Sequence, residues 1–278
     1  MTTMTIEWPF DVSLSPSLFL PVQKGLETLT QSSGKKWPTL DIYNQHPQTK
    51  IENHKGKEII FVSQSDSFDT FEQQYEPRIY LSGEVQTRLE NWHDLFQVLV
   101  WNIFPKTKAK LNALHYQQSI ERKETQANNR DPLENAITLF DECGAVLLSD
   151  RIELLDLVRN FQWKELFWNR RQELTEHFRC YVFGHAMYEK ALTPYVGMTS
   201  HCVLMETSSE ILSLSLSEQL TQIDTRLSNE YWDTQIQSPR DLQPFPLLGM
   251  PEWFAGNEEE SFYDNKDYFR SGRRSRQK

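Results

Sequence analysis

The sequence lacks the features that identify several classes of protein. Its 278 residues include only three cysteines, Cys143, Cys180 and Cys202, and no CxxC or CxxH pair suggests a zinc ribbon or a redox couple. No stretch approaches the 18 apolar residues of a membrane-spanning helix, and the N-terminal MTTMTIEWPFDVS has neither the basic flank nor the apolar run of a secretory signal. We therefore expect a cytoplasmic protein in a reducing compartment, with no membrane partner.

Positive charge is scarce as well. The chain carries 29 Lys and Arg against 39 Asp and Glu, a formal net charge of -10, which argues against a globally basic surface for nucleic acid. HExxH, GxSxG, the Walker loop and GxGxxG are all missing. The common signatures of zinc proteases, serine hydrolases and nucleotide binding are therefore absent, and the sequence identifies no cofactor.

Aromatic residues, by contrast, make up 12% of the chain, with eight tryptophans, and a chain of this length buries a large core without staples. Apolar residues at helical spacing predict helices over 18–31, 91–104, 105–118, 132–144, 150–160, 163–178, 185–192 and 215–232. Short β-branched or apolar runs predict strands over 57–64, 78–85, 145–149, 179–184 and 201–206. The predicted fold class is α+β, predominantly α-helical, with several packed helices and a few short strands.

Two segments bear on domain organisation. The polar stretch 119–131 predicts an exposed loop and is the best place for a boundary, so two lobes remain an alternative to one domain. We expect a single globular domain over 1–256, followed by an exposed tail over 257–278 that is first acidic and then basic. Such charged tails are usually disordered and exposed to solvent, without a binding role. This basic end is the one segment where we retain nucleic-acid binding as an alternative.

The helix predicted over 91–104 carries His93 and Asp94 in its first turn, and both are candidate catalytic residues. Asn91 is suited to cap this helix, and a negative Asp94 is favoured there by the helix dipole. The alternative chemistry is an HD metal dyad, which would need a further histidine and aspartate, namely His54 and Asp141 or Asp150. His54 sits in a polar turn, so the sequence leaves metal binding undecided.

The next helix places Lys108, Asn112 and His115 at i, i+4 and i+7, which forms one polar stripe. These three residues are candidate substrate-binding groups for a small anionic ligand, because lysines dominate this segment. The alternative is an ordinary solvated helix face.

Carboxylates and a second histidine give the remaining candidates. Asp141 and Glu142 end a helix, where negative charge opposes the dipole and needs a compensating partner. Adjacent helical residues point about 100° apart, so both cannot easily face one reacting atom. We select Asp141 and His185 as further catalytic candidates, with a structural salt bridge as the alternative for Asp141. Glu189, four residues after His185, has the spacing to orient its imidazole or to share a metal ion.

Several phrases together resemble a bacterial family catalogued as domain of unknown function 3025. The motifs that carry the resemblance are NWHDLFQVLVWNIFPKTKAKLN (91–112), TLFDECGAV (138–146), VFGHAMYEK (182–190), PYVGMT (194–199) and PFPLLGMPEW (244–253). The match runs from the IYLSGEV segment through FYDNKDYF and is expected to include the N-terminal helix. Gln97 stands where the family pattern has Asn, and Glu252 stands where it has Gly. The resemblance implies one coherent domain and supplies no reaction.

Two functional hypotheses follow. The first is a small-molecule enzyme, preferentially a hydrolase, whose pocket gathers the polar side chains that lie on apolar helices, because buried polar groups require partners. Histidines and carboxylates suffice for hydrolysis without an organic cofactor. The second is a non-catalytic interaction protein in which these residues are purely structural. A single cavity lined by the candidates distinguishes the first hypothesis from the second.

Overall fold

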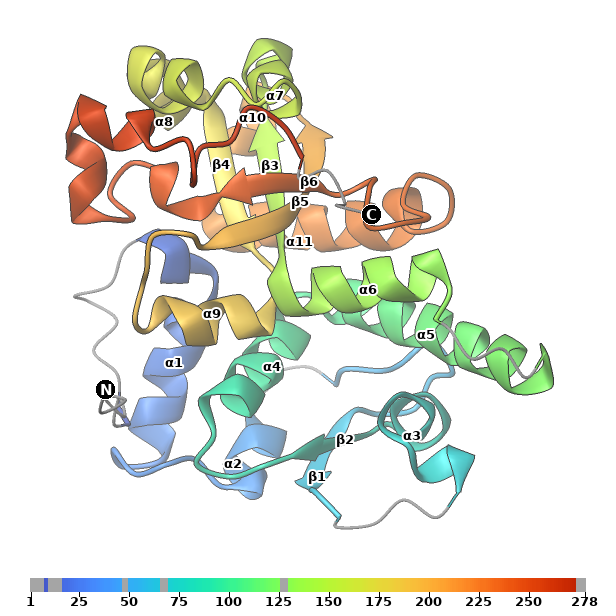
Figure 1. The fold of residues 1–278 in the computed structure, drawn as a ribbon. Coiled ribbons are helices and arrows are strands. Elements are labelled where there is room, and N and C mark those ends of the chain that lie inside the picture. The colour runs from blue at the N-terminus through green and yellow to red at the C-terminus, as the bar shows by residue number, and fades with distance from the viewer. Residues whose placement is uncertain (1–7, 10–16, 47–49, 66–69, 126–129, 274–278) are drawn as a thin grey trace.

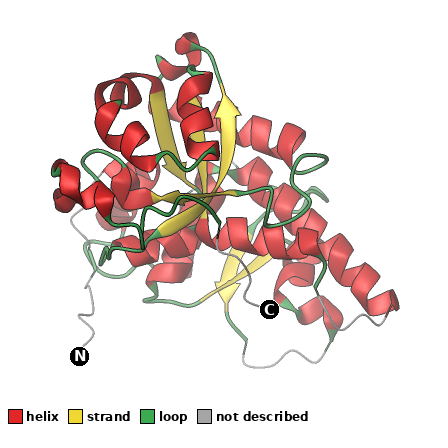
Figure 2. Cartoon of the chain, turned by 45° about the horizontal axis from the view of Figure 1, so that its top comes forward, coloured by secondary structure: helices red, strands yellow, loops and turns green. Residues whose placement is uncertain are grey.

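The structure is a computed structural model that describes residues 8–9, 17–46, 50–65, 70–125 and 130–273. Helices predominate and two small sheets accompany them, which confirms the predicted fold class (Figures 1 and 2). Buried apolar side chains from Trp8 to Phe269 belong to one contiguous cluster. None of the helices in the described part of the chain is both long and apolar enough to cross a membrane.

The larger sheet has four strands in the order β4-β3-β5-β6. Its members are β3 (Gly144–Ser149), β4 (Phe178–Val182), β5 (Thr199–Glu206) and β6 (Gln243–Pro246). Strand β3 runs parallel to β5 and antiparallel to β4, and β6 is antiparallel to β5. The register places Val146 beside Tyr181 on one side and Val203 on the other. Every residue of β3 is buried, which accounts for its unbroken run of small and apolar residues.

Helices surround this sheet and separate it from the smaller one (Figure 1). Those beside the four-stranded sheet are α7 (Ile152–Arg159), α8 (Arg171–His177), α10 (Ser209–Leu212) and α11 (Leu216–Arg226). The lower half of Figure 1 contains α1 (Leu20–Ser32), α2 (Leu40–Gln45), α3 (Tyr75–Ser82), α4 (Trp92–Ile103) and α5 (Pro105–Thr125), with β1 (Ile60–Ser63) parallel to β2 (Glu84–Thr87). Between the halves lie α6 (Pro132–Cys143) and α9 (His185–Ala191). These two helices link the sheet to the helical half.

The helix α4 is central because it packs against α1, α5 and α9. It begins where predicted, since the Asn91 side chain accepts a hydrogen bond from the Asp94 amide at 3.1 Å. Leu95, Phe96 and Val100 are completely buried, as expected for a helix that is apolar nearly all round. Pro105 starts the next helix, so α4 and α5 meet at a corner.

Two expectations for local structure are wrong. The segment 78–85 is not one strand, because α3 continues to Ser82 and ends at Gly83, whose φ of +81° suits glycine; β2 then begins at Glu84. The segment 119–131 is not a loop throughout, because α5 runs to Thr125. The last turn of α5 is exposed and carries two basic residues, whose positive charges interact favourably with the C-terminal end of the helix dipole. This interaction helps to stabilise a helical segment that has no apolar face. Residues 126–129 lie outside the described part.

The predicted exposed tail is also wrong for residues 257–269. Asn257 is completely buried, and the aromatic side chains of Tyr263, Tyr268 and Phe269 join the core. Tyr268 donates a hydrogen bond to the Met198 carbonyl at 2.7 Å, so this segment is fastened to the sheet region. Aromatic residues that follow the acidic run provide enough apolar area to overcome its charge. The last basic residues, 274–278, lie outside the described residues, and their proposed role stays a prediction.

The start of α5 is capped by a side chain from another helix. Asp224 of α11 is buried and accepts hydrogen bonds from the backbone amides of Lys106 at 3.0 Å and Thr107 at 2.8 Å. These amides have no partner within α5, so the carboxylate replaces a local N-cap. Burial raises the pKa of Asp224, and the Thr107 hydrogen bonds oppose that rise.

Replacing Asp224 with alanine should destabilise the protein by about 1 to 2 kcal/mol, because two buried amides lose their acceptor. We expect the melting temperature to fall by roughly 3 to 8 °C. Asp233→Ala is the matched control, since Asp233 is half-exposed and pairs only with Lys110 at the surface. A thermal melt in which the two variants behave alike would contradict the capping role of Asp224.

Candidate functional site

A cavity of about 510 Å³ opens between α3, α4, α5 and α6, with the start of α9 at one end. This volume falls within the usual range of small-molecule sites. All seven residues proposed from the sequence line it: His93, Asp94, Lys108, Asn112, His115, Asp141 and His185. The structure therefore brings the candidates together around one space, although they come from separate helices.

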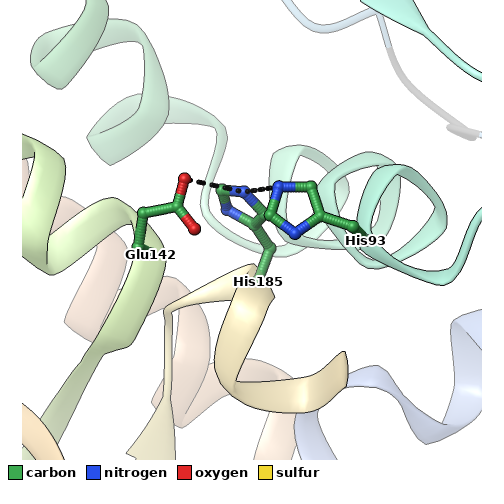
Figure 3. Close-up of side chains that lie close together, drawn as sticks. All are labelled: His93, Glu142 and His185. Carbon is green, nitrogen blue, oxygen red and sulfur yellow. Dashed lines mark hydrogen bonds and ion pairs between the residues drawn. The ribbon is translucent and has the colours of Figure 1, made fainter. Parts of the chain in front are cut away.

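Three side chains meet at one end of the cavity (Figure 3). His93 lies in the first turn of α4, Glu142 in the last turn of α6, and His185 is the first residue of α9. The Nε2 atoms of His93 and His185 are 3.0 Å apart, and His185 Nε2 lies 3.7 Å from Glu142 Oε1. One ligand atom from each residue falls within 4.8 Å of the other two. We call His93, Glu142 and His185 the His-Glu-His cluster; these residues are able to hold a metal ion or to exchange protons.

Backbone contacts between β3 and β4 bring two members of the cluster together. The Gly144 carbonyl accepts hydrogen bonds from the amides of Phe183 and Gly184, both at 2.9 Å. A side chain at Gly184 would place its Cβ 2.4 Å from the Glu142 carbonyl oxygen, so only glycine permits this approach. The end of α6 and the start of α9 are therefore held in direct contact.

A further carboxylate lies behind each histidine. Glu189 Oε2 is 3.1 Å from His93 Nδ1, whereas Asp141 Oδ2 is 3.8 Å from His185 Nδ1. The expectation that Glu189 orients His185 through their i, i+4 spacing is thus wrong: Glu189 reaches across to α4 instead. Each imidazole presents Nε2 to the cluster and Nδ1 to a carboxylate.

Lys108 and Asp141 form a buried ion pair between α5 and α6, with Nζ and Oδ1 2.5 Å apart. Lys108 Nζ also lies 5.3 Å from the centre of the Trp101 ring. Burial alone would raise the pKa of Asp141, but the charge and the hydrogen bond of Lys108 hold it below its usual value. The interpretation of Lys108, Asn112 and His115 as a solvated face is wrong, because each is at least nine-tenths buried.

Burial shifts the pKa values of two members of the cluster, His185 and Glu142. It lowers the pKa of His185 to about 3, so this imidazole is neutral near pH 7. Burial and the neighbouring Asp141 charge together raise the pKa of Glu142. His185 therefore offers a nitrogen lone pair, and Glu142 is more basic than a free carboxylate.

Unpartnered polar atoms line the middle of the cavity. Asn112 Nδ2 donates to the Glu76 carbonyl at 3.0 Å and to Glu76 Oε2 at 2.7 Å, which fixes the amide and leaves Oδ1 without a partner among the described residues. Gln86 Oε1 accepts from the Ser65 amide at 3.1 Å, and its Nε2 is likewise unpartnered, as is Trp101 Nε1. These buried atoms, one acceptor and two donors, belong to residues that line the cavity and lie just beneath its surface.

His115 lies at the other end of the cavity. Its Nε2 is 3.2 Å from Thr138 Oγ1, and its Nδ1 is 3.7 Å from Glu134 Oε1. Glu134 is buried and also pairs with Arg122. His115 is therefore part of a second polar group, and it does not join the His-Glu-His cluster.

Asp94 forms an ion pair with Arg88. Its carboxylate accepts from the Arg88 backbone amide at 2.6 Å and from Arg88 Nε and Nη2 at 3.0 and 2.8 Å. This bidentate pair, reinforced by the amide, joins the end of β2 to the start of α4. Although Asp94 lines the cavity, its hydrogen bonds indicate a structural role.

The HD metal dyad considered from the sequence is not formed. Asp94 turns to Arg88 rather than sharing a centre with His93, His54 is exposed and outside the cavity, and Asp150 pairs with His177 at 3.0 Å. The Arg88 amide and guanidinium occupy both oxygens of Asp94, which is why Asp94 does not share an ion with His93.

Sequence reasoning missed Glu142 and Glu189 as site residues. Adjacent side chains on a helix point in different directions, so we did not expect Asp141 and Glu142 to act together. In the structure, this difference in direction lets Asp141 face Lys108 while Glu142 faces the histidines. The available signal for Glu142 was its position next to Asp141, which we had selected from the sequence. No sequence signal connects Glu189 to His93, because the two are 96 positions apart.

A family model described as "Protein of unknown function (DUF3025)" matches residues 59–273. This match confirms the resemblance expected from the motifs, and it includes every member of the His-Glu-His cluster. The N-terminal helix, which we had expected within the resemblance, lies outside the matched residues. No curated protein and no solved structure matches the chain.

Neighbouring substitutions at the start of α4 should separate structural from functional roles. Asp94→Asn weakens a buried, charge-assisted contact and should cost about 2 kcal/mol, which lowers the melting temperature by roughly 4 to 8 °C. His93→Asn should lower it by no more than about 2 °C, since the side chain is partly exposed and an amide can keep part of its hydrogen bonding. Equal losses in a thermal melt would show that His93 is structural too.

Proposed function

Because the chain belongs to the DUF3025 family of proteins of unknown function, we propose a function from the geometry of the site: an enzyme that hydrolyses a small polar molecule inside the cavity. One observation carries the proposal. The His-Glu-His cluster brings two imidazole nitrogens and a carboxylate oxygen together at the end of a cavity of substrate size. Such groups supply the proton transfers that hydrolysis requires.

The residues fall into roles by position. The His-Glu-His cluster is where the attacking water would be held and deprotonated, because its donor atoms converge on one point. Lys108 lies on the cavity wall beside this cluster and can stabilise negative charge that develops on the substrate oxygen. Asp141 holds Lys108 in place through their ion pair.

The middle of the cavity suggests the substrate class. Asn112 Oδ1 accepts a hydrogen bond, whereas Gln86 Nε2 and Trp101 Nε1 donate, which complements a neutral group that contains both N–H and C=O. We therefore favour a small amide-bearing molecule. The anionic ligand expected from the lysines stays a prediction with weaker support, because Asp141 neutralises Lys108 and Asp94 neutralises Arg88.

The alternative is an interaction protein whose polar residues serve only the fold. The ion pairs of Lys108 and Asp94 fit that alternative. The buried atoms of Asn112, Gln86 and Trp101 do not, because an orphaned buried donor or acceptor destabilises the fold unless a ligand or solvent satisfies it. The cavity therefore favours the enzyme.

The enzyme is tested with a panel of para-nitrophenyl esters, anilides and phosphates. We expect the wild-type protein to hydrolyse at least one class, and His93→Asn and Glu142→Gln to lose about 100-fold or more of that rate, as is typical for acid–base groups. His177→Asn is the control, because His177 pairs with Asp150 outside the cavity. Thermal melts verify that each variant is folded.

The proposal fails if the wild-type protein hydrolyses no member of the panel. It also fails if both cluster variants, shown to be folded, retain the wild-type rate. Equal loss in His177→Asn would trace the effect to the fold rather than to the cluster.

A further inference from the structure

We propose that the His-Glu-His cluster binds one divalent transition-metal ion of the zinc type through His93 Nε2, His185 Nε2 and Glu142 Oε1. The role of the ion in hydrolysis rests on the proposed function, whereas its binding does not. The three atoms come from three helices that meet at one end of the cavity (Figure 3). Two imidazoles and one carboxylate form a ligand set used by catalytic zinc sites.

The spacing of the three atoms fits a single ion. Zinc binds nitrogen and oxygen at about 2.0 to 2.2 Å, so tetrahedral ligands lie roughly 3.3 to 3.5 Å from one another. The two imidazole nitrogens are 3.0 Å apart, and His185 Nε2 is 3.7 Å from the Glu142 oxygen. These two separations need shifts of only a few tenths of an ångström, and the third, between His93 and Glu142, is within 4.8 Å.

The groups behind the histidines favour the tautomers that a metal requires. A carboxylate at 3.1 Å from His93 Nδ1 accepts a hydrogen bond from the protonated Nδ1, which leaves the lone pair on Nε2. His185 Nδ1 lies 3.8 Å from an Asp141 carboxylate oxygen, beyond hydrogen-bond distance, so this carboxylate favours a proton on Nδ1 by its charge alone. An imidazole whose second nitrogen faces a carboxylate is the usual arrangement around metal ligands.

A direct hydrogen bond between the imidazoles explains the geometry less well. If His185 Nε2 donated to His93 Nε2, the neutral His185 ring would turn the lone pair of Nδ1 toward the negative Asp141. If both Nδ1 atoms carry the protons, two lone pairs face each other at 3.0 Å and repel. An extra proton, with His93 donating from Nδ1 to Glu189 and from Nε2 to His185, would remove both conflicts, and so would a metal ion between the two Nε2 atoms. Only the metal ion also uses Glu142 as a third ligand.

All three proposed ligand residues line the cavity, so a fourth coordination position would be open to it, as in catalytic rather than structural zinc sites. An ion there would lower the pKa of a bound water and polarise a substrate oxygen. Imidazole ligands favour zinc, copper, nickel and iron, whereas magnesium and calcium prefer oxygen. The site should therefore discriminate strongly against magnesium.

Zinc itself is the probe. After dialysis against a chelator, isothermal titration of the full chain with zinc should show one site, and magnesium should show none. Cobalt(II) should give visible absorption bands that report its ligands. His93→Asn and Glu142→Gln should weaken zinc binding by about 100-fold or more, and Glu189→Gln by about 10-fold, because Glu189 acts through His93. His177→Asn, which removes a histidine outside the cluster, should bind as the wild type does.

The metal site is overturned if the wild-type protein binds no zinc at micromolar concentration, or if folded His93→Asn and Glu142→Gln bind as tightly as the wild type. Glu142→Gln keeps the test decisive if a histidine variant fails to fold. Failure of the two proposals is distinguishable. Hydrolysis by a protein that binds no zinc overturns the metal site alone, whereas one bound zinc without hydrolysis of any substrate overturns the proposed function alone.

Discussion

The ion pair between Lys108 and Asp141 joins α5 to α6 at the wall of the cavity, and the arrangement of the site depends on it. Removing either charge would leave the other buried and uncompensated. The pair also offsets the unfavourable position of Asp141 at the C-terminal end of α6. Lys108 holds one oxygen of the Asp141 carboxylate, and the other oxygen faces His185. Glu142, the next residue in the chain, points toward the histidines. One contact between two helices thus orients both acids and one imidazole.

Much of the fold was predictable because its signals are local. Asn91 caps α4, Pro105 begins α5, and Asp131 caps α6 by accepting from the Leu133 amide. The failures lie where local chemistry is ambiguous. The segment 78–85 is rich in residues that suit strands, yet packing against α5 makes most of it helical. The polar residues after 118 continue a helix that no apolar periodicity reveals.

The candidate site was predictable as a set of residues but not as a set of contacts. Helical spacing correctly placed Lys108, Asn112 and His115 on one stripe, and all three line the cavity. Their partners come from other helices: Asp141 and Thr138 from α6, and Glu76 from α3. Spacing along one helix carries no information about such neighbours. The same limit explains why Glu189 was paired with His185 on its own helix rather than with His93.

The contact between His93 and His185 joins positions 92 residues apart. Closing a loop of that length has an entropic cost that only the docking of the intervening elements can repay, so the two rings cannot come together early in folding. Whatever the cluster binds, it is a late-forming reporter of the complete tertiary structure. A chain with correct helices but an undocked α9 would look native by helical content and still lack the site. Occupancy of the cluster would therefore measure the fraction of molecules that have finished folding, which helical content does not.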